Sequence, residues 1–198
     1  PTEGLLSDGT LYVAKFHDDQ TGEWLALTPE TTGMSIEDIL VFSRLAGSKV
    51  GATTMDRPEW IAAHPHRAEA YCALTNNKNR GVDDYASVDE ANPRVQNKNG
   101  QVLELEDDHA GTEFVWNLLI VAGDPEAADT YFGGFDKTQV SPISCPDNLA
   151  FDSKGNLWIS TDGNALDSND GLFAVVLDGE RRGETRQFLT VPAGAETC

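Results

Sequence analysis

Hydrophobic and polar residues alternate along most of the chain in short runs, the pattern typical of half-buried β-strands. The runs come in pairs, and turn-forming residues such as Gly, Asn, Asp and Pro separate the two members of each pair. We expect strands over residues 10–16, 23–27, 101–105, 114–122, 148–152, 155–161, 172–177 and 185–191, and two more between residues 57 and 75. The sequence therefore predicts a mainly β fold.

Two segments depart from this alternation. Residues 35–45 carry apolar side chains at helical spacing, and Ser35 with Asp38 resembles a capping box in which Asp replaces the usual Glu. With Gly47 as the C-terminal stop, we expect one helix near residues 35–46, inserted between strands. Residues 76–99 are polar and rich in Asn and Asp, so we expect a long loop that is either functional or mobile.

One short segment recurs. Pro58-Glu59-Trp60-Ile61-Ala62 matches Pro146-Asp147-Asn148-Leu149-Ala150, and each copy is followed by a turn and an aromatic strand. The copies lie 88 residues apart, about two units of the ~40–45 residues of a propeller blade, with residues 101–122 filling the blade between. Residues 195–197 would open a third such inner strand. The repeat favours a β-propeller or partial propeller of about four blades.

Acidic and amide side chains fall at equivalent positions of this repeat. In a propeller, the first residues of the inner strands face the central channel at one end, where Glu59, Asp147, Asn148 and Glu196 would converge. Oxygen-rich clusters of this kind suit Ca²⁺.

Arg57 stands two residues before Glu59, with Pro58 between them. Proline biases Arg57 towards an extended conformation, so the two side chains would project from the same side of the strand. The pair is then either a plain surface ion pair or a site in which Arg57 binds an oxyanion and Glu59 holds a cation.

Composition limits the partners. The chain has 198 residues, which suggests a single domain over 1–198, and 33 acidic against 14 basic residues give a net charge of −19. Such a surface repels nucleic acid and anionic membranes, and no apolar run reaches the ~18 residues of a membrane span. The sequence opens on Pro-Thr-Glu-Gly without an initiator Met or a visible signal peptide, so we expect a mature product, an engineered product or a fragment.

The three cysteines, Cys72, Cys145 and Cys198, have no metal-type spacing, and at most one disulfide fits. Cys72 lies in an apolar strand-like run, where a buried thiol is the default. No Gly-rich phosphate loop, G-x-S-x-G elbow or H-E-x-x-H motif occurs.

Several segments together resemble the PhoX alkaline phosphatases. They are MDRPEWIA (55–62), ALTNN (73–77), ANPR with VLEL (91–105), DHAGTEFVWNLLIVAGDP (108–125), CPDNLAFDSKGNLWISTDG (145–163) and VPAGAET (191–197). The resemblance implies a six-bladed propeller that is exported by the twin-arginine route to the periplasm or outside and hydrolyses phosphate esters with calcium and iron (Fe³⁺).

The resemblance also implies residue roles. Arg57 matches the phosphate-contacting arginine, and Glu59, Asp147 and Asn148 match calcium-binding positions, while Glu196 lies in a motif near the channel. The family protein is much longer, and its iron-binding cysteine and glutamate lie upstream of residue 1. We therefore expect a C-terminal portion that holds part of the active site and has no phosphatase activity alone.

Two rival functions stay open. The chain is alternatively a non-catalytic propeller segment that serves as an interaction module and self-associates through exposed sheet edges. It is also compatible with a calcium-dependent lactonase or sugar-binding propeller, because a segment such as FDSKGNLWISTDG occurs widely in those folds.

Overall fold

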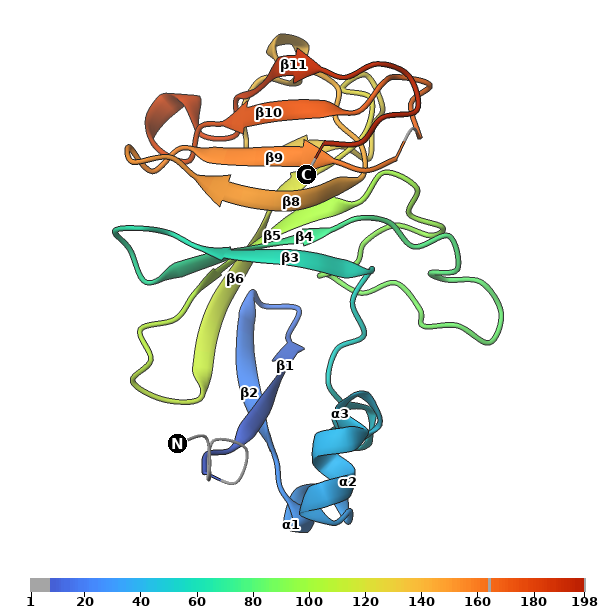
Figure 1. The fold of residues 1–198 in the computed structure, drawn as a ribbon, viewed down its shortest axis with the longest axis vertical. Coiled ribbons are helices and arrows are strands. Elements are labelled where there is room, and N and C mark those ends of the chain that lie inside the picture. The colour runs from blue at the N-terminus through green and yellow to red at the C-terminus, as the bar shows by residue number, and fades with distance from the viewer. Residues whose placement is uncertain (1–7, 164, 198) are drawn as a thin grey trace.

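The structure is a computed structural model that describes residues 8–163 and 165–197, and two antiparallel sheets dominate it (Figure 1). The first sheet has the strand order β1-β2-β6-β5-β4-β3, and the short β7 pairs with β6. Its strands are β1 (Leu11–Phe16), β2 (Thr21–Leu27), β3 (Pro58–Ala63), β4 (Glu69–Leu74), β5 (Gln101–Glu106), β6 (Glu113–Val121) and β7 (Tyr131–Phe132). The predicted strands are thus present, with ends that shift by a few residues.

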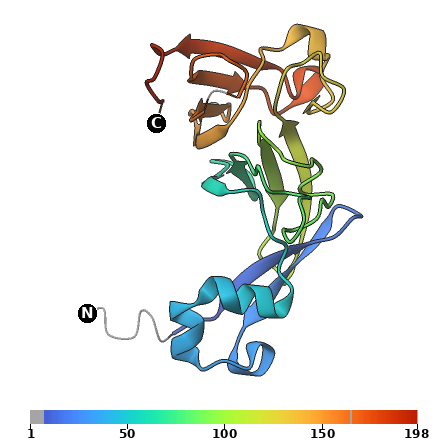
Figure 2. The ribbon, with the colours of Figure 1, turned by 90° about the vertical axis from the view of Figure 1, so that its right-hand side faces the viewer.

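The second sheet has the order β11-β10-β9-β8 and lies beyond β3 in Figure 1. Its strands are β8 (Pro146–Phe151), β9 (Leu157–Thr161), β10 (Gly171–Val175) and β11 (Thr185–Thr190). The main hydrophobic core lies between the sheets, where β8 contacts β3 and β4, and it includes Tyr71, Leu119, Phe132, Ile159 and Phe173. The side view shows the two sheets and the helices following one another along an elongated, curved chain (Figure 2).

Each sheet contains one four-stranded antiparallel meander, β3-β4-β5-β6 in the first sheet and β8-β9-β10-β11 in the second. Residues 101–122 do not form a separate blade, because β5 pairs with β4 along its whole length and β6 pairs with β5. The 88-residue offset therefore spans one unit rather than two. The described residues contain two such units, so the prediction of about four blades is not confirmed, and residues 195–197 form no strand.

The prediction of a single helix is wrong. Between β2 and β3 the chain forms three short α-helices, α1 (Pro29–Thr32), α2 (Ile36–Val41) and α3 (Ser43–Val50). The Ser35 hydroxyl does accept a hydrogen bond from the Asp38 amide (3.1 Å), but Phe42 leaves helical geometry at φ −115° and separates α2 from α3. Gly47 lies buried within α3, and Gly51, with φ +79°, ends that helix. In the described part of the chain, no helix has both the length and the apolarity to cross a membrane.

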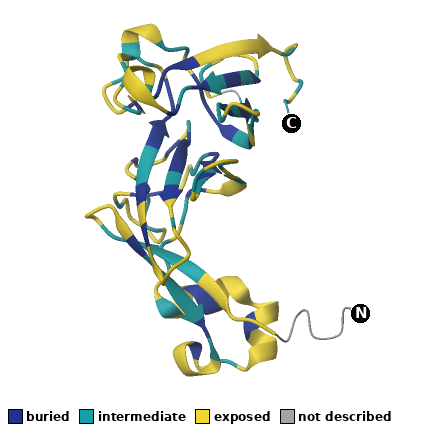
Figure 3. Ribbon diagram, turned by 90° about the vertical axis from the view of Figure 1, so that its left-hand side faces the viewer, coloured by how far each residue is buried: buried dark blue, intermediate teal, exposed yellow. Residues whose placement is uncertain are grey.

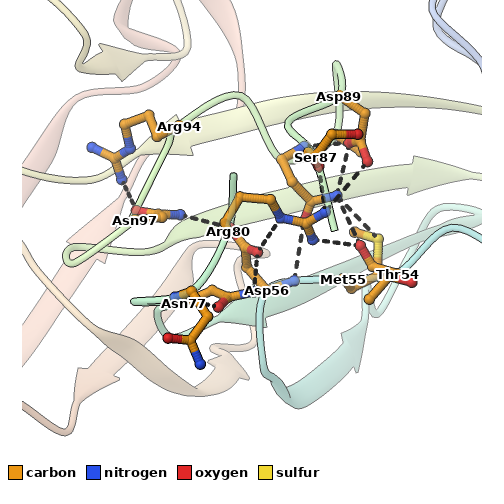
Figure 4. A network of polar contacts seen from close by, with 12 residues as sticks. Thr54, Met55, Asp56, Asn77, Arg80, Ser87, Asp89, Arg94 and Asn97 are labelled. Atoms are coloured by element: carbon orange, nitrogen blue, oxygen red, sulfur yellow. Dashed lines mark hydrogen bonds and ion pairs between the residues drawn. The ribbon is translucent and has the colours of Figure 1, made fainter. Parts of the chain in front are cut away.

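The polar segment 76–99 is ordered around a buried ion pair (Figure 4). Arg80 Nε donates to Asp56 Oδ1 at 2.8 Å, and both side chains are almost completely buried. Asn77 and Asn97 also donate to the Asp56 carboxylate, at 2.9 and 3.1 Å. The asparagines and the arginine of this loop therefore supply the donors that a buried carboxylate requires.

A second polar network joins the two sheets. Arg182, which follows β10, donates to both carboxylate oxygens of Glu104 on β5, at 3.2 and 2.5 Å. Glu104 also accepts from the hydroxyl of Tyr71 (2.7 Å), whose pKa is raised by burial and by its hydrogen bond to Glu104. Nearby, Arg67 lies between β3 and β4 of the first sheet, and its Nη1 is 2.6 Å from Oδ1 of Asp178, which follows β10 of the second sheet.

Replacing Arg182 with alanine is expected to lower the free energy of unfolding by about 1–2 kcal/mol, because a partly buried bidentate ion pair between the sheets is lost. Arg186→Ala is the matched control, since Arg186 is more exposed and pairs with Glu184 inside one sheet. Urea denaturation measures both. Equal losses in the two variants would contradict a bridging role.

Candidate functional site

Two equivalent backbone corners define the site. Arg57 and Cys145 each precede a proline that begins an inner strand, and both have left-handed backbones, with φ of +46° and +51°. The Arg57 carbonyl accepts a hydrogen bond from the Thr75 amide (3.1 Å), and the Cys145 carbonyl accepts from the Asp162 amide (3.1 Å). The extended conformation expected for Arg57 is thus wrong, because the corner turns its carbonyl towards the neighbouring strand.

The strands β3 and β8 also share an irregularity after each corner. The pairing register shifts between Pro58 and Trp60 in β3 and between Pro146 and Leu149 in β8. The sequence repeat therefore corresponds to a repeated three-dimensional corner, and it brings residues 57–59 and 145–148 to neighbouring strands.

Arg57 is held in place while its guanidinium stays accessible. Nη2 donates to Glu59 Oε1 at 2.8 Å, and Nη1 donates to Asn76 Oδ1 at 3.3 Å. The Arg57 side chain is nevertheless 56% exposed. Since a guanidinium has five N–H donors, the remaining ones can bind a ligand oxygen.

Negative side chains gather at Asp147. The pKa of Asp147 is raised, first by burial and then by the negative charges of Glu59 and Asp162, with Glu196 adding to the effect. The positive charge of Arg57 opposes this rise. The structure therefore brings Arg57, Glu59 and Glu196 within electrostatic reach of Asp147.

Asn148 and Glu196 are positioned by the second sheet. The side-chain oxygen of Asn148 accepts from the Ser160 hydroxyl on β9 at 3.2 Å. Beside Glu196, the Thr197 hydroxyl donates to the carbonyls of Thr161 (3.2 Å) and Gly171 (2.9 Å). The last described residues are thereby attached to the end of β9 that pairs with Pro146.

The side chains of this site offer oxygen donors. Carboxylate and amide oxygens suit Ca²⁺, and the raised pKa of Asp147 indicates negative charge that a cation would offset. Within residues 8–163 and 165–197, no three His, Cys, Asp or Glu side chains lie close enough to form a ready metal site. A cysteine binds a metal ion as the thiolate, but burial raises the pKa of Cys72 to about 11 and also raises that of Cys145, so neither of these thiols is activated as a metal ligand. Neither cysteine is disulfide-bonded, and Cys198 lies outside the described residues.

Asp147→Asn is expected to stabilise the metal-free chain at pH 7. Because the pKa of Asp147 is raised in the folded state, its protonated carboxyl favours folding below the ordinary pKa of 3.8. This contribution to the free energy of unfolding is lost as the pH rises through the folded pKa. The variant removes that loss, so its melting temperature should exceed the wild-type value at pH 7 in EGTA and equal it near pH 3.

Exposed Asp83→Asn serves as the control for this pH comparison. Calcium should stabilise the wild type more than the Asp147 variant. A variant that is less stable than the wild type at pH 7 would contradict the charge crowding around Asp147.

Three residues of the site were not among the predicted ones: Asn76, Cys145 and Asp162. Asp162 occupies the hydrogen-bonding position equivalent to Thr75, but it lies 87 residues later, whereas the 88-residue offset of the repeat leads to Gly163. Asn76 carried no signal of its own, because its role depends on the left-handed corner at Arg57.

The chain is similar to known phosphatases. A sequence model of the family described as "Alkaline phosphatase PhoX" matches residues 2–198. A solved structure, Pseudomonas fluorescens PhoX in complex with vanadate, a transition state analogue, superimposes with a TM-score of 0.80 at 35% sequence identity. The match covers 98% of this chain and 38% of that one, so the chain spans well under half the length of its structural relative. No curated protein matches it significantly.

Proposed function

Because the chain belongs to the PhoX alkaline phosphatase family, we propose that it acts in the hydrolysis of phosphate monoesters, with Arg57 binding the phosphoryl oxygens. The observation that carries this proposal is the exposed guanidinium of Arg57 beside a group of carboxylates. Its two terminal nitrogens are held by hydrogen bonds, one to Glu59 and one to Asn76. A planar guanidinium matches the geometry of phosphate oxygens and stabilises the charge that develops on a transferring phosphoryl group.

Calcium is part of the proposed site. Glu59, Asp147, Asn148 and Glu196 would hold it, and its chemistry there is to offset the negative charge of the phosphate ester. The protein carries a net charge of −19, and three carboxylates raise the pKa of Asp147, so one arginine has to attract an anion against a negative field. We therefore propose that anion binding depends on calcium.

We further propose that the 198-residue chain binds the anion without turning over a substrate. The chain spans only 38% of the phosphatase that it resembles, and its described thiols, with their raised pKa values, are not activated as metal ligands. Titration calorimetry of the chain with inorganic phosphate and with orthovanadate, in millimolar calcium and in EGTA, tests the binding step. Hydrolysis of p-nitrophenyl phosphate under the same conditions tests turnover.

The outcomes separate the parts of the proposal. Binding of both anions only with calcium, and without hydrolysis, supports it. Turnover of p-nitrophenyl phosphate by this chain would overturn the inactivity, and failure to bind either anion in calcium would overturn the role of Arg57. Turnover of a lactone instead would favour the lactonase-like alternative.

An interaction role is a second candidate because apolar side chains are exposed on edge strands. Ile61 on β3 is 64% exposed and Phe188 on β11 is 68% exposed, and both strands, like the helices, are largely exposed in Figure 3. We propose that these edges associate with a second copy of the chain. Light scattering after gel filtration should give a mass above 21.4 kDa, and Ile61→Lys should restore the monomer.

A further inference from the structure

Asn76 connects the two corners of the site. It lies two residues after the end of β4, where its Oδ1 accepts from Arg57 Nη1 (3.3 Å) and its Nδ2 donates to Cys145 Sγ (3.8 Å). The side-chain amide of Asn76 therefore links the exposed guanidinium of Arg57, in the first sheet, to the buried thiol of Cys145, which precedes the second sheet. Cys145 in turn donates to the carbonyl of Lys98 at 3.4 Å.

The backbone under Asn76 is fixed by the buried ion pair. Asn77 donates to Asp56 Oδ1 at 2.9 Å, and this carboxylate is fully buried and held by Arg80 (Figure 4). Thr75 donates its amide proton to the carbonyl of Arg57 at 3.1 Å. Residues 56–57 and 75–77 are thus joined by three hydrogen bonds, and only the bond between Arg57 and Asn76 involves an exposed side chain.

We propose that Asn76 is a positioning residue that orients the Arg57 guanidinium for an oxyanion. Glu59 restrains Nη2 and Asn76 restrains Nη1, so together they fix the plane of the group while leaving other N–H donors free. A long side chain that is already ordered loses less conformational freedom on binding, so its affinity for the anion is higher. The identity of the anion rests on the proposed function, whereas the restraint on Arg57 does not.

Asn76→Ala tests the proposal in the 198-residue chain, and the exposed Asn79→Ala is the matched control, because no hydrogen bond from the Asn79 side chain is present among the described residues. The first readout is the ¹⁵N NMR signal of the Arg57 guanidinium without any anion. We expect separate Nη signals in the wild type and the control, and averaged signals in Asn76→Ala. The second readout is the Kd for inorganic phosphate in calcium, which should rise about tenfold in Asn76→Ala only.

Asn76→Asp separates orientation from charge. An aspartate still accepts from Arg57, so the separate Nη signals should return, but its negative charge keeps phosphate affinity low. Unchanged guanidinium signals together with an unchanged Kd in Asn76→Ala would overturn the inference. If the wild type binds neither phosphate nor orthovanadate, the proposed function fails, while the NMR comparison still decides whether Asn76 restrains Arg57. Circular dichroism of each variant confirms that it is folded.

Discussion

Replacing Arg80 with alanine is expected to lower the free energy of unfolding by about 3–5 kcal/mol, because the substitution leaves the fully buried carboxylate of Asp56 without its cation. The guanidinium also donates to the carbonyls of Thr54 (2.5 Å) and Ser87 (2.8 Å), and both of these hydrogen bonds would be lost as well. For a chain of this length the loss corresponds to roughly 10 °C in melting temperature. Thermal and urea denaturation measure it.

The control for this prediction is Arg44→Ala, which removes an exposed arginine from α3 and should change stability by less than about 0.5 kcal/mol. Removing both charges, in Asp56→Asn with Arg80→Met, should cost less than Arg80→Ala alone, since no buried charge is left unpaired. A change of under 1 kcal/mol in Arg80→Ala would show that the ion pair does not organise the loop.

Arg57→Ala is expected to weaken phosphate binding by about 100-fold in the presence of calcium. The side chain supplies a positive charge that acts on Asp147, and its free N–H groups are the proposed contacts to the anion. Arg57→Lys should recover only part of the affinity, because an ammonium cannot make the paired, planar contacts of a guanidinium. Calorimetric titration with inorganic phosphate measures both variants.

Stability gives the control within the same proteins. Arg57 is exposed, so its replacement should leave the melting temperature nearly unchanged, in contrast to Arg80→Ala. Equal phosphate affinity in the wild type, Arg57→Ala and Arg57→Lys would show that Arg57 does not bind the anion.

The strands were predictable because their alternation depends on local burial, which the sequence carries directly. Their grouping was not. An 88-residue offset is compatible with one unit or with two, and only the pairing of β4 with β5 decides between them. The break between α2 and α3 was also hidden, since Phe42 continues the apolar pattern of the helix while its backbone leaves helical geometry.

The proximity of two carboxylates was predictable from the repeat, while their roles stay a prediction. Equivalent positions in the two copies brought Glu59 and Asp147 into electrostatic reach, as expected from the repeat. The backbone conformation of Arg57 was not predictable. A following proline favours an extended conformation, whereas Arg57 is left-handed. The role of the Asn-rich loop was missed because a buried carboxylate at Asp56 has no local sequence signature.

The adjacency of Asp56 to Arg57, and of Asn77 to Asn76, has a consequence for genetics. In a library of random variants, substitutions at Arg80 or Asn97 would be scored as loss of ligand recognition, although neither side chain belongs to the group around Asp147. The same substitutions would lower heat tolerance. Selection for ligand recognition and selection for heat tolerance would therefore act on the same positions of this loop.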